Sequence, residues 1–157
     1  MASMAPDNVA REYDAAVIKH LELIQVVIAR LGSNGFVVKG WAVTVAGLFL
    51  GFAVESSNYR LALISVLPTL AFWYLDTYFL RSERLFRSLY DRVRRGEPPV
   101  EPFYMAATSS DFVGSLDSPP TNAGVMFSAT LRGLYLALLG AAVLTIVVIE
   151  VAPRAIV

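Results

Sequence analysis

Apolar positions along the 157 residues form one amphipathic pattern followed by three continuous apolar segments. Between residues 8 and 31 apolar residues recur at spacings of four, three, four and three, at Val17, Leu21, Ile24, Ile28 and Leu31. This period predicts an amphipathic helix, with Asp7 as its N-cap and Gly32 as its C-cap. We expect the helix to lie on protein or on a membrane surface rather than to span a membrane.

Three segments, residues 36–54, 61–80 and 131–152, are apolar enough to span a bilayer. At about 1.5 Å per residue, helices of this length cross a hydrocarbon core of about 30 Å. Lys39 carries the only charge in the first segment and lies near one end, where its ammonium can reach the lipid headgroups. The short polar turn at 55–60 implies that the first two segments form an antiparallel hairpin. The sequence therefore predicts an all-α membrane protein with three transmembrane helices in a single domain, residues 1–157.

Two features inside these segments affect helix packing. Gly47 and Gly51 form a small-xxx-small pair that would let a second helix approach closely, although glycine scattered by composition explains them equally well. Pro68 is expected to kink the second span.

The second span continues without a helix breaker into residues 81–95, which we expect to be a cytoplasmic extension of the same helix. Residues 96–122 are rich in proline, serine, aspartate and glycine, and we expect a cytoplasmic loop there. Eleven Lys and Arg residues fall on the side of the N-terminus and of this loop, against two on the other side. The positive-inside bias predicts a multi-pass protein with a cytoplasmic N-terminus and an external C-terminus.

Asp76 is the strongest single candidate for a functional residue. Placing an ionisable side chain within a span costs free energy, and such a residue usually has a partner. It lies only five residues before Arg81, so it can also belong to the membrane interface. The interpretations that stay open are a structural anchor or intersubunit salt bridge, a pore or gate element, and an incidental position.

The extension at 81–95 contains six arginines, against the two acids Glu83 and Asp91. Three roles are open for this surface: orienting the protein while contacting lipid headgroups, binding a phosphate-bearing ligand, or binding another protein. We assign ligand binding as the candidate role of the arginines and gating or intersubunit contacts as that of Asp76, Glu83 and Asp91. The six candidates for ligand binding are Arg81, Arg84, Arg87, Arg92, Arg94 and Arg95.

The composition argues against several chemistries. No cysteine is present, and His20, the only histidine, has no second ligand at metal-binding spacing, so we expect no metal, no cofactor and a structural role for His20. The chain contains no GxSxG, GxxxxGK, HExxH or GxGxxG motif and no carboxylate pair placed for acid–base work. We therefore expect no enzyme activity.

The string YLDTYFLRSERLFRSLY at Tyr74–Tyr90, together with KGWAVTV at Lys39–Val45, resembles small bacterial membrane effectors of anti-phage defence systems, including Hailong-type systems. The resemblance covers about a third of the chain and does not include residues 96–122. It implies a homo-oligomeric, tetrameric, channel-like effector of the inner membrane. It also implies an oligonucleotide ligand that a nucleotidyltransferase partner makes and that the cytoplasmic arginines contact.

Two hypotheses follow. In the first, copies of the chain assemble in the lipid bilayer into an effector or channel that disrupts membrane integrity under control of a phosphate-bearing ligand. Three spans of one chain cannot enclose a pore, whereas several copies can. In the second, the chain is a non-catalytic membrane anchor whose cytoplasmic helices recruit a soluble partner.

Overall fold

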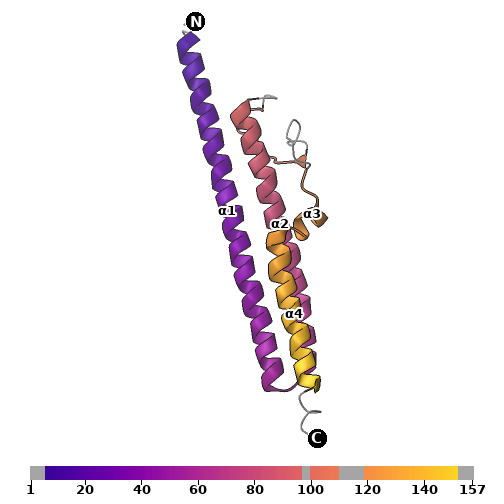
Figure 1. Ribbon diagram of the computed structural model, residues 1–157. Coiled ribbons are helices and arrows are strands. Elements are labelled where there is room, and N and C mark those ends of the chain that lie inside the picture. The colour runs from indigo at the N-terminus through magenta and orange to yellow at the C-terminus, as the bar shows by residue number, and fades with distance from the viewer. Residues whose placement is uncertain (1–5, 97–99, 110–118, 152–157) are drawn as a thin grey trace. The chain divides into compact units, whose positions relative to one another are not determined.

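The computed structural model describes residues 6–96, 100–109 and 119–151, and the regular elements of this described part are helices (Figure 1). Its elements are α1 (Pro6–Glu55), α2 (Tyr59–Arg95), α3 (Asn122–Met126) and α4 (Ala129–Val151). Within α1, the stretch Ala15–Glu55 is long and apolar enough to cross a membrane, as are α2 and α4. The prediction of an all-α chain with three candidate spans is confirmed at this level.

The separation of α1 into an amphipathic helix and a first span is wrong. α1 continues through the Gly32–Gly35 segment, so Gly32 is not a C-cap, and Gly32 does not adopt the positive φ of such a cap. Glycine destabilises a helix interior by about 1 kcal/mol relative to alanine, but Gly35 is buried, and a Cβ added there would lie 3.4 Å from Asp76 Oδ1. This close packing against α2 favours the continuation of α1 as a helix through the glycines. The predicted N-cap is also displaced, because α1 begins at Pro6, a residue suited to the first helical position.

The turn between α1 and α2 is a Schellman motif, which satisfies the last carbonyls of α1. The amide of Asn58 donates to Ala53 O at 3.0 Å, and the amide of Ser57 donates to Val54 O at 3.2 Å. Ser57 takes the left-handed position usually held by glycine, with φ 48°. The side chain of Asn58 then accepts the amide of Arg60 at 3.1 Å and caps α2. These local bonds explain why the predicted polar turn can be so short.

α2 continues as one helix from the second apolar segment into the arginine-rich extension, as the absence of a breaker predicts. It also continues through Pro68. On the same stretch, Ser65 Oγ donates to Ala62 O at 2.7 Å and Thr69 Oγ1 to Ser65 O at 2.8 Å, so both buried hydroxyls are satisfied within the helix. The expected kink at Pro68 stays a prediction.

The chain divides into two compact units. The loop unit comprises Met1–Gly32 and Arg81–Pro120, and the span unit comprises Ser33–Leu80 and Thr121–Val157. In the loop unit the core consists of the buried residues Ile24, Leu89 and Val93, against which partly buried side chains of α1, α2 and residues 100–107 pack. The apolar seam predicted for residues 8–31 supplies the α1 contribution to this core.

The span unit has its own core, and its helices bury mainly small residues. The core consists of Ala42, Trp73, Val125, Leu131 and Tyr135. Small buried residues let helices pack closely in lipid, where the hydrophobic effect does not drive association. On α1 and α2 they include Ala42, Ala46, Ala53, Ala62, Ser65 and Thr69.

The region predicted as a loop, residues 96–122, is non-helical over most of its described residues and ends in the short helix α3. Thr121 caps α3, since its Oγ1 accepts the amide of Gly124 at 3.1 Å. α4 follows at Ala129, so the third candidate span lies close to the predicted residues 131–152.

Candidate functional site

The span unit contains a buried ion pair between Lys39 of α1 and Asp76 of α2. Lys39 Nζ lies 2.7 Å from Asp76 Oδ1 and also donates to Gly35 O at 3.4 Å. The Asp76 side chain is 1% exposed, whereas that of Lys39 is 28% exposed. The sequence predicts that Lys39 reaches the headgroups, and it leaves an intersubunit salt bridge open for Asp76. In the structure both charges find their partner within the chain.

The second carboxylate oxygen of Asp76 contacts α4. The hydroxyl of Tyr135 lies 3.2 Å from Asp76 Oδ2 and 3.2 Å from Phe72 O, and its single proton is shared between these two acceptors. The Tyr135 ring stacks on Trp73 with centroids 5.6 Å apart and an interplanar angle of 6°. One carboxylate therefore connects all three candidate spans.

The end of α3 contacts the same network through Trp73 of α2. The indole Nε1 of Trp73 donates to Met126 O at 3.0 Å, and its ring meets the Phe127 ring edge-on at 5.8 Å. The same indole thus contacts Tyr135 on α4 and the segment that leads into α4. Thr77, one residue after Asp76, donates its hydroxyl to Trp73 O at 2.7 Å and is satisfied within α2.

The depth of the ion pair follows from the hairpin geometry. Lys39 lies 18 residues before Ser57 in the turn, and Asp76 lies 19 residues after it. At about 1.5 Å per residue both are about 27 Å from the turn, close to the far end of a hydrocarbon core of about 30 Å. Exposed aromatic residues mark the same level: Trp41, Tyr74 and Tyr78. Such residues concentrate at membrane interfaces, so the pair belongs at one boundary of the apolar layer rather than at its centre.

The six arginines of the extension, all in the loop unit, do not converge on one site. Arg87 pairs with Glu83 four residues before it, and Arg94 Nε lies 3.6 Å from Asp91 Oδ1. Arg81 Nε donates to Pro120 O at 3.0 Å, and Arg92 is partly buried with an interaction of its own.

Arg84 and Arg95 are exposed, and their side chains form no hydrogen bond or ion pair in the described part of the chain. Since 11 residues make about three helical turns, these two share one face of α2, about 16 Å apart. Glu83 and Asp91, the two acids predicted to serve gating or intersubunit contacts, form ion pairs with arginines of their own helix. Their role between copies stays a prediction. The predicted ligand surface is therefore a charged face with two unpaired guanidinium groups.

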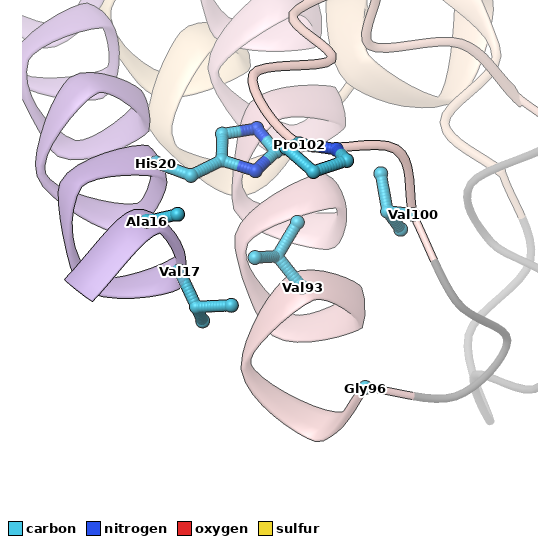
Figure 2. Close-up of a pocket in the computed structure, with 7 residues that line it drawn as sticks. All are labelled: Ala16, Val17, His20, Val93, Gly96, Val100 and Pro102. Atoms are coloured by element: carbon cyan, nitrogen blue, oxygen red, sulfur yellow. The ribbon is translucent and has the colours of Figure 1, made fainter. Parts of the chain in front are cut away.

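His20 holds residues 100–107 against the two helices of the loop unit. It is 2% exposed, and its Nε2 lies 2.7 Å from Tyr104 O, so Nε2 carries the proton and donates to the carbonyl. Figure 2 shows the ring beside Pro102, Val93 and Val100 at a cavity of about 30 Å³, which has room for about one water molecule. Phe103 lies next to the ring, with centroids 6.1 Å apart, and has a left-handed φ of 64°.

These contacts give His20 a structural role in the loop unit. Among residues 6–96, 100–109 and 119–151 no group of three or more His, Cys, Asp or Glu side chains is placed to hold a metal ion.

Lys39 and Tyr135 are the two residues of the site that sequence reasoning missed. The signal for Lys39 was available, because opposite charges stood at matching distances on the two arms of a predicted hairpin. Tyr135 gave no comparable signal, since nothing in the sequence fixes which side of α4 faces α2.

Comparison with known proteins adds no assignment. No family model, no curated protein and no solved structure matches the chain.

Proposed function

We propose that this chain is a homo-oligomeric effector or channel of the bacterial inner membrane that disrupts membrane integrity in anti-phage defence. The observation that carries the proposal is the Lys39–Asp76–Tyr135 network, a charged centre shared by three apolar helices. At the boundary of an apolar layer a buried charge such as that of Asp76 is still costly, and ionisable residues of spanning helices are functional candidates by default. The sequence resemblance supplies the biological setting, with a nucleotidyltransferase partner that makes the ligand.

A permeation path requires several copies in this proposal. The buried hydroxyls of α2 bond to carbonyls of their own helix, and the carboxylate of Asp76 is held by Lys39 and Tyr135. Polar groups held in this way do not line an aqueous route inside one chain. Assembly of several copies, a tetramer by the resemblance, would place the route between chains.

Control by a phosphate-bearing nucleotide or oligonucleotide is assigned to the arginine face of α2. Arg84 and Arg95 are the first contacts in this proposal, because their guanidinium groups are exposed and have no partner among the described residues. Arg87 and Arg94 would exchange their acidic partners for phosphate, which binds arginine in two-pronged geometry. The positive-inside bias places this face in the cytoplasm, with the C-terminus in the periplasm.

The test is membrane potential, read with a voltage-sensitive dye in cells that express the chain with and without its neighbouring genes. We expect depolarisation by the wild type under activating conditions and its loss in Asp76→Ala. We also expect altered control in Arg84→Ala and in Arg84→Ala combined with Arg87→Ala. Arg30→Ala is the matched control, since Arg30 is likewise exposed, lies in the loop unit and has no ion pair among the described residues. A membrane potential that is unchanged under all conditions, including nuclease treatment, would contradict the proposal.

A second candidate function is favoured by one observation in the loop unit. Ile18 is 59% exposed and Val26 is 65% exposed on α1, and both lie before the apolar segment that starts at residue 36. Exposed aliphatic residues outside the membrane fit an anchor that recruits a soluble protein. Light scattering of the purified protein in detergent separates the two, because the anchor predicts a lone protomer and the effector a discrete oligomer.

A further inference from the structure

α1 carries a shallow, open apolar depression in the span unit, which one face of this helix forms and which is called the groove below. Gly47 and Gly51 form its floor together with Thr44, and Leu48 and Phe52 flank it with side chains that are 58% and 63% exposed. The groove has a volume of about 490 Å³. A Cβ added at either glycine would meet nothing within 4 Å, so these glycines are not needed for packing within the chain.

The shape of this face differs from the other exposed parts of the apolar helices. Leu67 of α2 is 73% exposed and Leu144 of α4 is 63% exposed, as expected of side chains that face lipid. Two glycines four residues apart instead leave a depression in which the backbone of another helix can approach closely. The buried small residues Ala42, Ala46 and Ala53 already serve the packing inside the chain, so the glycine pair is available for a different contact.

Charge at one end of the groove indicates its occupant. Glu55 lines that end, is exposed and has no ion pair or hydrogen bond of its side chain within the described chain. Arg60, at the start of α2, is exposed and likewise lacks a side-chain partner there. Copies of one chain insert into a membrane with the same orientation, so a second copy brings its own Arg60 to the depth of Glu55.

We infer that the groove is the contact between two copies of this chain, with α1 of one copy packed in parallel against α1 of the next. Gly47 and Gly51 of both copies allow the backbones to meet, and Glu55 of each copy pairs with Arg60 of the other. The contact is self-complementary and closes on two copies about a two-fold axis along the membrane normal, so a tetramer would be built from two such dimers that meet through a second contact. This inference rests on the homo-oligomeric state proposed above and specifies its interface.

Cysteine cross-linking in native membranes tests the contact, and the chain has no cysteine of its own to interfere. Under an oxidising catalyst, Thr44→Cys is expected to give a covalent dimer of the 17.1 kDa chain at a yield several-fold above that of Val143→Cys. Val143 of α4 is the control, because it is 61% exposed and lies away from the groove. A dimer from Val143→Cys with none from Thr44→Cys overturns the inference.

Substitutions in the full-length protein provide a second measurement. Gly47→Leu combined with Gly51→Leu should fill the groove and abolish the Thr44→Cys cross-link, whereas Gly140→Leu, at an α4 glycine that also has open space around it, should leave the yield unchanged. Arg60→Glu should lower the yield, and Glu55→Arg combined with Arg60→Glu should restore it. Cross-linking that is unaffected by the double leucine variant overturns the inference. Depolarisation without the Thr44→Cys dimer overturns this interface alone, whereas a Thr44→Cys dimer without depolarisation counts against the proposed function alone.

Discussion

Lys39 and Asp76 lie at nearly equal distances from the turn that joins α1 and α2, and their charged groups meet at 2.7 Å. An antiparallel hairpin brings such residues to the same depth. Because a one-turn slip between the helices would separate them by about 5 Å, the ion pair fixes the register of the hairpin. Contacts between small apolar residues are not directional, so the ion pair supplies a register preference that apolar packing alone does not.

Removal of one charge should therefore destabilise the fold. Asp76→Asn leaves the Lys39 ammonium without its counter-charge, and we expect the free energy of unfolding to fall by about 2 kcal/mol. This is less than the roughly 3–5 kcal/mol found for fully buried pairs, because Lys39 is 28% exposed and can turn toward water. Thermal unfolding in detergent measures the loss.

Two controls make this prediction specific to the pair. Lys19→Ala breaks an exposed pair with Glu22 on the same helix and should change stability by less than about 0.5 kcal/mol. The double variant Lys39→Met, Asp76→Leu should lose less than the sum of its single variants, since no charge is left unpaired. Strict additivity would contradict coupling between the two residues.

Gly35 should tolerate alanine but no larger residue. An added Cβ would lie 3.4 Å from Asp76 Oδ1, an ordinary contact, whereas the branches of valine would enter the space of the carboxylate. Gly35→Ala is therefore expected to be near neutral, and Gly35→Val to lower the melting temperature in detergent. Gly40→Val is the matched control, because nothing lies within 4 Å of a Cβ at Gly40. Equal effects of valine at the two positions would show that helix propensity, not Asp76, decides the outcome.

The elements were largely predictable from the sequence, and the reason lies in composition. No helix breaker separates the apolar half of residues 61–95 from the arginine-rich half, and α2 continues from one into the other through Arg95. The helix end predicted at Gly32 is wrong, because the low helix propensity of glycine is a weak effect compared with tertiary packing. Gly35 packs beside Asp76, and α1 continues. A local rule could not detect this contact, which involves residues 41 positions apart.

The candidate site was predicted only in part. Asp76 was singled out as an isolated acid in an apolar segment, but its partners depend on the register of the hairpin and on the rotation of α4. The arginine face was found by counting charges, and counting does not reveal that Glu83 and Asp91 pair with two of the arginines. Side-chain pairs on one helix follow from spacing and are predictable from the sequence, whereas contacts between helices are not.

His20 should control how firmly residues 100–107 lie on the loop unit. His20→Ala removes the hydrogen bond to Tyr104 O and the ring beside Phe103, and it enlarges a cavity that already exists. Hydrogen–deuterium exchange in residues 100–107 is expected to increase several-fold in this variant. Lys19→Ala serves as the control on the preceding, exposed position. If exchange in the segment stays unchanged, the apolar contacts of Val100 and Tyr104 alone hold it in place.

Tyr135→Phe should loosen α4 without removing its aromatic packing. The variant keeps the stacked contact with Trp73 but loses the hydroxyl shared by Phe72 O and Asp76 Oδ2. Interhelical hydrogen bonds in membranes contribute about 0.6 kcal/mol on average, so we expect a loss of about 1 kcal/mol because a charged acceptor is involved. Tyr74→Phe is the control, since Tyr74 is 67% exposed. In Asp76→Asn the same substitution should have a smaller effect, because the acceptor is then neutral. An equal effect in both backgrounds would assign the contribution of the hydroxyl to Phe72 O rather than to the carboxylate.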